Sequence, residues 1–86
     1  MANTKSAEKR NRQSEERRVR NRADRSRLRT AIKKLRSAVE SGDASLAQEL
    51  LPGTLSIIDK TAQKGVIHDN AAARYKSRLA HQVAGL

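Results

Sequence analysis

Apolar side chains recur every three or four residues in three stretches of the chain, which is the spacing of one face of an α-helix. The first stretch comprises Leu28, Ala31, Ile32, Leu35, Ala38 and Val39. The second comprises Ala47, Leu50, Leu51, Leu55, Ile58 and Ala62. The third comprises Ala72, Tyr75, Leu79, Val83 and, at its end, Leu86. The pattern predicts three helices that pack through these faces.

The first predicted helix is much longer than its apolar face. Residues 6–41 contain neither Pro nor Gly, and Gly42 suits the left-handed residue that follows a helix. Such a helix would be about 54 Å long at about 1.5 Å per residue, which is too long for a domain of this size to cover. Within this helix, the only apolar residues before Leu28 are Ala7, Val19 and Ala23, and they form no stripe. We therefore expect the first part of this helix to project.

The second predicted helix covers about residues 44–64. Asp43 or Ser45 can cap its start, and Ser45 with Gln48 has the spacing of a reciprocal capping box. Pro52-Gly53 interrupts the stretch, because proline removes a backbone donor and clashes with the preceding turn. The apolar spacing resumes in phase after it, which favours a kinked helix over a break into two. Gly65 is the expected residue beyond its end.

The third predicted helix begins near His68 or Asp69, either of which can cap it. Both connections are short, so consecutive helices should run antiparallel. The predicted fold is all-α: a single domain over residues 1–86 that consists of a three-helix bundle, residues 28–86, and a basic helical extension, residues 1–27.

Composition argues against an enzyme. The 86 residues include no Cys and a single aromatic residue, Tyr75. The two histidines, His68 and His81, would lie about 20 Å apart along one helix and could not share a metal. No phosphate-binding Gly loop, zinc motif or nucleophile elbow is present. No apolar run approaches the roughly 20 residues that span a bilayer. We expect no catalytic residues, metal, cofactor, small-molecule substrate or membrane partner, and no secretory signal.

Charge is concentrated at the start of the chain. Residues 1–36 contain 14 Lys or Arg and 4 Asp or Glu, whereas the remaining residues contain five of each. Pairs at i,i+4, Glu8 with Arg12 and Glu16 with Arg20, could offset only a few of these cations at about 0.2–0.5 kcal/mol each. The surplus therefore predicts a polyanion partner. Arg outnumbers Lys ten to four there, and its planar guanidinium favours nucleic acid.

Three kinds of polyanion partner remain to be compared. A basic-region leucine zipper needs sustained heptads, but Gly42 falls where a third leucine would follow Leu28 and Leu35. Base stacking on aromatic side chains needs aromatic residues that the chain lacks. An amphipathic membrane helix needs bulky apolar residues opposite its cations, and residues 1–27 supply almost none. Recognition of a folded RNA through its shape and phosphates is what remains, with a DNA-compacting protein as the strongest rival.

The predicted RNA contacts begin with the basic residues and short donors of the first helix. From charge the set includes Arg12, Arg17, Arg18, Arg22 and Lys34, and Asn21 joins it as a short donor for phosphate or sugar oxygens. A second cluster lies in the third helix, where Arg74 and Arg78 share a face opposite Tyr75 and Leu79. Spacing alone leaves this second cluster open between an RNA contact and an ordinary polar face.

Three stretches resemble the bacterial small-subunit ribosomal protein S20 family in order and spacing. They are "MANTKSAEKRNRQSE", "RSRLRTAIKKLRSAVESGD" and "IDKTAQKGVIHDNAAARYKSRLA". The resemblance covers essentially the whole chain. It implies a three-helix structural protein of the cytoplasmic ribosome, a monomer there, that binds small-subunit ribosomal RNA, lies among other ribosomal components and aids assembly. By position it implies RNA contacts at Lys5, Ser6, Lys9, Arg10, Arg25, Ser26, Arg29, Thr30, Lys33, His68, Asn70, Arg74, Lys76, Ser77 and Arg78.

Some positions depart from the family's usual pattern. Glu8, Glu16 and Asp24 bring acids into a basic setting, so we expect them to orient neighbouring arginines rather than to contact RNA. Pro52-Gly53 implies a second helix that is more bent than usual. Because most cations of residues 1–27 lack a partner in the chain, we expect this segment to be largely disordered in the free protein and to fold on binding.

Overall fold

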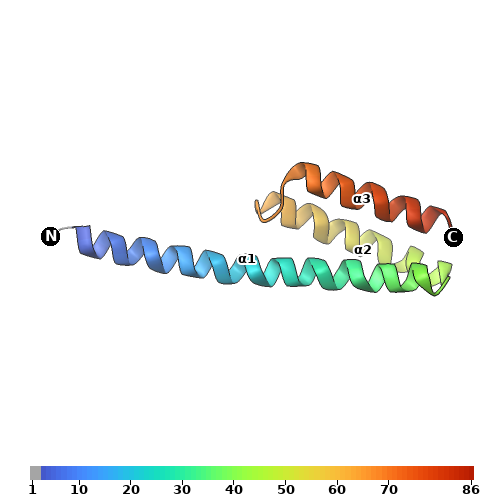
Figure 1. Cartoon of the computed structure of the whole chain (residues 1–86), viewed down its shortest axis with the longest axis horizontal. Helices are drawn as coiled ribbons and strands as arrows, with labels where there is room; N and C mark the ends of the chain where they lie inside the picture. The colour runs from blue at the N-terminus through green and yellow to red at the C-terminus, as the bar shows by residue number, and fades with distance from the viewer. Residues whose placement is uncertain (1–2) are drawn as a thin grey trace.

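The chain forms three α-helices in the computed structural model, which describes residues 3–86 and the side chains from residue 5 onward (Figure 1). α1 spans Asn3–Glu40, α2 spans Ala44–Gln63 and α3 spans Asp69–Ala84. α2 and α3 lie along the C-terminal half of α1, and the N-terminal half of α1 extends beyond them. The molecule therefore measures 63 × 20 × 15 Å. The predicted all-α fold with a long, projecting first helix is confirmed.

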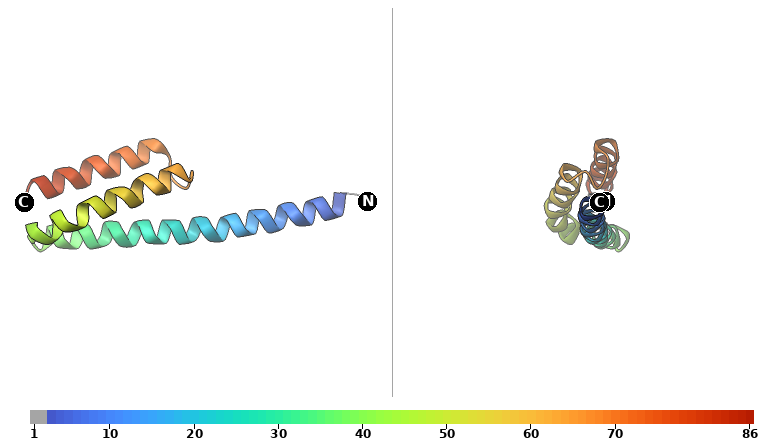
Figure 2. Two further views of the ribbon diagram at one scale, coloured as in Figure 1. Left: turned by 180° about the vertical axis from the view of Figure 1, so that it is seen from behind. Right: turned by 90° about the vertical axis from the view of Figure 1, so that its left-hand side faces the viewer.

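The three helices enclose one core at the C-terminal end of α1. The end-on view of Figure 2 places them at the corners of a triangle. Each short connection reverses the chain, so α2 runs antiparallel to both α1 and α3. The buried apolar residues are Leu28, Ile32, Leu35, Ala38, Ala47, Ile58, Val66, Ala72, Leu79 and Val83. All except Val66 belong to the three predicted faces.

Three residues differ from the predicted faces. Leu86 follows the end of α3 and is 44% exposed, so it does not point into the core as expected. Thr54 and Thr61 are buried, although their hydroxyl groups excluded them from the apolar face of α2. Their Oγ1 atoms donate to the carbonyls four residues earlier, at 2.9 and 2.6 Å, so neither hydroxyl is buried without a partner.

The two connections begin with the same hydrogen-bond arrangement. Gly42 and Gly65 have φ values of +74° and +75°, and each follows the end of a helix. Each glycine amide donates to a carbonyl three residues back, and the next amide donates to one five residues back. This is the Schellman motif, which requires a left-handed residue that glycine supplies at little cost. Both glycines were predicted at these places.

The starts of α2 and α3 are capped by side chains. Asp43 accepts a hydrogen bond from the Leu46 amide at 3.1 Å, so Asp43 is the cap and the alternative box of Ser45 with Gln48 is not used. His68 Nδ1 accepts from the Asn70 amide at 3.1 Å and caps α3. α2 is one continuous helix through Pro52, which excludes the alternative of two short helices.

α1 leaves the bundle between residues 20 and 24. Every side chain from residue 5 to residue 20 is exposed, including Val19 at 61%. We call residues 5–20 the projecting segment. Asp24 lies 3.4 Å from Lys64, the residue that follows α2, and the Asp24 side chain is only 14% exposed. Asp24 therefore contacts the bundle one turn before Leu28.

Candidate nucleic-acid interface

Most cations of α1 have no carboxylate partner among the side chains that the structure describes. Among residues 5–36, Arg18 pairs with Glu15, and Arg27 lies 3.9 Å from Asp24. No other basic side chain in that range lies within 4 Å of a carboxylate. The predicted ion pairs Glu8–Arg12 and Glu16–Arg20 are not formed, so this prediction is wrong. Arg20 instead donates from Nε to the Glu16 carbonyl oxygen at 3.5 Å, because its side chain folds back along the helix.

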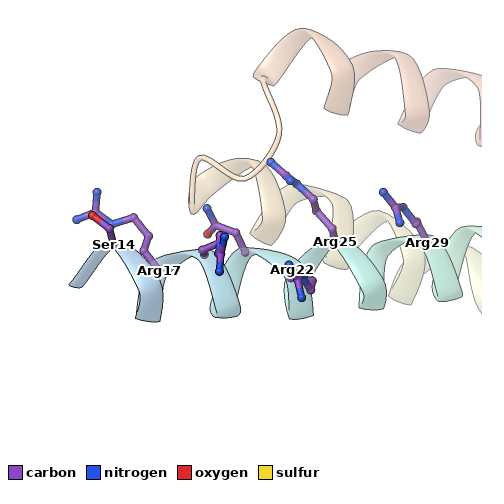
Figure 3. Close-up of a pocket in the computed structure, with 7 residues that line it drawn as sticks. Ser14, Arg17, Arg22, Arg25 and Arg29 are labelled. Atoms are coloured by element: carbon purple, nitrogen blue, oxygen red, sulfur yellow. The ribbon is translucent and has the colours of Figure 1, made fainter. Parts of the chain in front are cut away.

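One flank of α1 carries a row of arginines. Arg18, Arg22, Arg25 and Arg29 follow one another at steps of four, three and four residues, so they lie along one side of the helix. We call these four residues the arginine ridge. They line an open depression together with Ser14, Arg17 and Asn21. Figure 3 shows Arg25 and Arg29 extending from α1 on the side where the other helices lie, with Ser14 and Arg17 farther out. The ridge thus joins the projecting segment to the bundle.

A groove between α1 and α3 continues from the ridge. Its lining includes Arg29, Lys33 and Arg36 from α1 and Tyr75 from α3. Only Glu40 adds a negative charge to the lining. We call this depression the α1–α3 groove. The sequence-based set omitted Arg36 and treated Tyr75 as a core residue, since charge and spacing do not tell which flank of α1 faces α3.

Two of the RNA contacts predicted at α3 already have a role inside the fold, and the others do not. Lys76 lies 2.9 Å from Asp59 of α2, and His68 caps α3, so both already have partners in the chain. Arg78 is exposed, and no carboxylate among the described residues lies within 4 Å of it. Arg74, Asn70 and Ser77 are also exposed.

The other predicted residues do not all meet on one surface. Some lie in the projecting segment, beyond the bundle: Lys5, Ser6, Lys9, Arg10 and Arg12. Ser26, Thr30 and Lys34 line a depression between α1 and α2, on a different flank of α1 from the arginine ridge. Since an α-helix with its side chains is about 10–12 Å across, a single RNA strand could not touch all these flanks at once.

Fold and charge together define the class as small, strongly basic three-helix proteins with a projecting helix. No three His, Asp or Glu side chains among the described residues are grouped as metal ligands would be. None of the described helices is long and apolar enough to cross a bilayer.

Comparison with known proteins places the chain within this class. Residues 2–84 match the family model of ribosomal protein S20. The chain is 52% identical to the small ribosomal subunit protein bS20 of Koribacter versatilis over 83 residues, which are 96% of this chain and 93% of that protein. It is 54% identical to the protein of that name from Bordetella avium over 86 residues, covering 100% of this chain and 99% of that protein. The chain therefore belongs to the ribosomal protein S20 family, as its resemblance predicted. This is a family of ribosomal proteins and not of enzymes.

Proposed function

We propose that the chain is a structural component of the small ribosomal subunit in the cytoplasm and binds small-subunit ribosomal RNA directly. Support comes from family membership and from relatives that are named as proteins of that subunit. The observation that carries direct RNA binding is the arginine ridge. Its side chains are exposed, and only Arg18 has a carboxylate partner.

Phosphate groups would supply the charges that α1 lacks. Each phosphate that a cation neutralises releases condensed counterions, so affinity rises steeply with the number of contacts. Arginine can donate two parallel hydrogen bonds to one phosphate. The ridge would follow one RNA strand, and Arg74 and Arg78 of α3 would reach another across the α1–α3 groove. Holding two RNA segments at a fixed spacing stabilises a folded junction and aids assembly without turnover.

The projecting segment adds contacts at a distance from the bundle. Its side chains are exposed on all sides of the helix, so it suits insertion between RNA segments better than docking on one flat surface. We propose that residues 1–27 order on RNA while residues 28–86 fold as the bundle. The protein would then act as a monomer among other ribosomal components.

A binding titration with small-subunit ribosomal RNA tests this proposal. Log affinity should fall steeply with log salt concentration, by about 0.7–0.9 for each phosphate contact. The double variant R25E/R29E should weaken binding by more than about a hundredfold, since charge reversal adds repulsion to the lost contacts. Lys60→Glu is the matched control, because Lys60 is exposed on α2 and outside the ridge and the grooves. A flat salt response, or equal binding by the two variants, would contradict the proposal, and displacement by excess duplex DNA would favour a DNA-binding role.

A further inference from the structure

α2 contains two adjacent residues that weaken a helix, Pro52 and Gly53. Proline has no backbone N–H, so the carbonyl oxygen of Gln48, four residues earlier, receives no hydrogen bond from residue 52. Glycine is the least favourable helix residue after proline. The fold does not require glycine at residue 53, because its φ is not positive and a Cβ atom there would meet nothing within 4 Å. The pair therefore divides α2 into a first half, residues 44–51, and a second half, residues 54–63.

This weak point of α2 faces solvent. Gln48, Glu49, Pro52 and Gly53 are all exposed, so water reaches the backbone on this side of the helix. Sharp bends in helices occur where proline or an inserted water interrupts the ladder of hydrogen bonds. Water can donate to the carbonyl oxygen that Pro52 leaves free, so the two halves can separate here with little loss of hydrogen bonding.

The two halves of α2 are unequally buried. Among the described residues of the first half only Ala47 is buried, while Leu50 and Leu51 are partly buried and Leu46 is exposed. The second half buries three side chains, and one of them, Ile58, is fully enclosed. Because burial of apolar surface is the main term that favours folding, the second half is held more firmly than the first.

Ion pairs between helices also support only the second half. Lys64, directly after it, lies 3.4 Å from Asp24 of α1, and Asp59 within it lies 2.9 Å from Lys76 of α3. Glu49 is the one charged residue of the first half. No basic side chain among the described residues lies within 4 Å of its carboxylate.

We infer that the first half of α2 opens as a separate unit about a hinge at Pro52-Gly53, while the second half stays packed on α1 and α3. Segments with few buried apolar contacts and an exposed backbone open at a lower free energy than the core beside them. The opening uncovers the face of α1 around Ala38, which Leu46 and Leu50 flank. The arginine ridge stays in place, so the bundle changes its shape at one end alone. This inference concerns the free protein and does not depend on the proposed function.

Amide hydrogen exchange of the free full-length protein, followed residue by residue by NMR, tests the hinge. The amides of residues 47–51 should have similar protection factors, about tenfold or more below those of residues 58–63, since only the second set waits for the core to unfold. Low concentrations of urea should hardly change exchange at residues 47–51, because a local opening exposes little surface. They should accelerate exchange at residues 58–63.

A double variant with Pro52→Ala and Gly53→Ala removes the hinge. Alanine restores the missing hydrogen bond and favours helix, so the protein stays folded, which circular dichroism checks. Protection of residues 47–51 should rise by about tenfold or more. Ser56→Ala is the matched control, because Ser56 is an exposed residue of the second half that gains helix propensity in the same way. It should leave the protection of residues 47–51 unchanged.

Two results would overturn the hinge. Equal protection of the two halves in the free protein would mean that α2 opens only with the whole bundle. Protection that declines steadily toward Ala44 and does not respond to the double variant would mean that α2 frays from its start. A rise at residues 47–51 in the double variant, without a rise in Ser56→Ala, supports the hinge.

Discussion

The Asp24 carboxylate lies 3.4 Å from the Lys64 ammonium, forty residues further along the chain. Lys64 caps the C-terminus of α2, and Asp24 stands where α1 leaves the bundle. This contact therefore anchors α1 to the C-terminal end of α2 at the place where α1 leaves the bundle. Asp24 therefore has a role inside the fold, and the absence of an RNA contact at Asp24 stays a prediction.

Removal of this carboxylate should destabilise the bundle modestly. Asp24→Ala loses the contacts to Lys64 and Arg27, whose side chains are 57% and 73% exposed. Partly exposed ion pairs contribute about 0.2–1 kcal/mol, and we expect a loss of that size in the free energy of unfolding by urea. Glu16→Ala, in the projecting segment, is the control and should leave the midpoint unchanged. An equal midpoint for both variants would show that the Asp24 contact contributes nothing.

Leu35 should contribute strongly to the stability of the core, although charged residues flank it in the sequence. Leu35 is fully buried at the centre of the α1 face, so Leu35→Ala leaves a cavity and should cost about 2–5 kcal/mol. In a bundle this small, that loss approaches the whole stability. Thermal unfolding followed by circular dichroism measures it. Val19→Ala changes an exposed residue and should shift the curve little; a similar shift for both would contradict the position of the core.

The same substitution should have opposite effects at two glycines. Gly65 has φ +75°, so Gly65→Ala forces a side chain into the left-handed region and should cost about 1–2 kcal/mol. Gly53 has ordinary helical backbone and open space around it, so Gly53→Ala should stabilise the free protein by about 0.4–1 kcal/mol. Denaturant unfolding of the two variants tests this pair. Effects of the same sign would contradict the assigned conformations.

Arg36 should contribute to RNA binding although sequence reasoning left it out. It lines the α1–α3 groove with Arg29 and Lys33. Arg36→Glu should therefore weaken binding of small-subunit ribosomal RNA by about tenfold or more, with a smaller salt slope. Binding equal to that of Lys60→Glu would remove the α1–α3 groove from the interface.

Sequence spacing predicted the helices because each apolar face repeats at three and four residues. The same reasoning found Gly42 and Gly65, since a left-handed residue after a helix is nearly always glycine. It missed Thr54 and Thr61, because their hydroxyls donate to the backbone carbonyls four residues earlier, a partner that is available only once the helix has formed.

The candidate interface was less predictable than the fold. Charge identified α1 as basic but not which flank faces α3, so Arg36 was omitted. The ion pairs of Asp24 with Lys64 and of Lys76 with Asp59 join different helices, and no local spacing indicates them. The division of the predicted residues between the arginine ridge and the depression between α1 and α2 likewise follows from where α2 and α3 pack on α1.

Ribosomal RNA should supply the negative charges that stabilise the part of α1 beyond the bundle. Amide hydrogen exchange of the protein, free and bound to small-subunit ribosomal RNA, tests it most directly. We expect residues 5–20 to exchange rapidly in the free protein and slowly in the complex, while Leu28–Ala38 stay protected in both. Equal protection of residues 5–20 with and without RNA would contradict the claim.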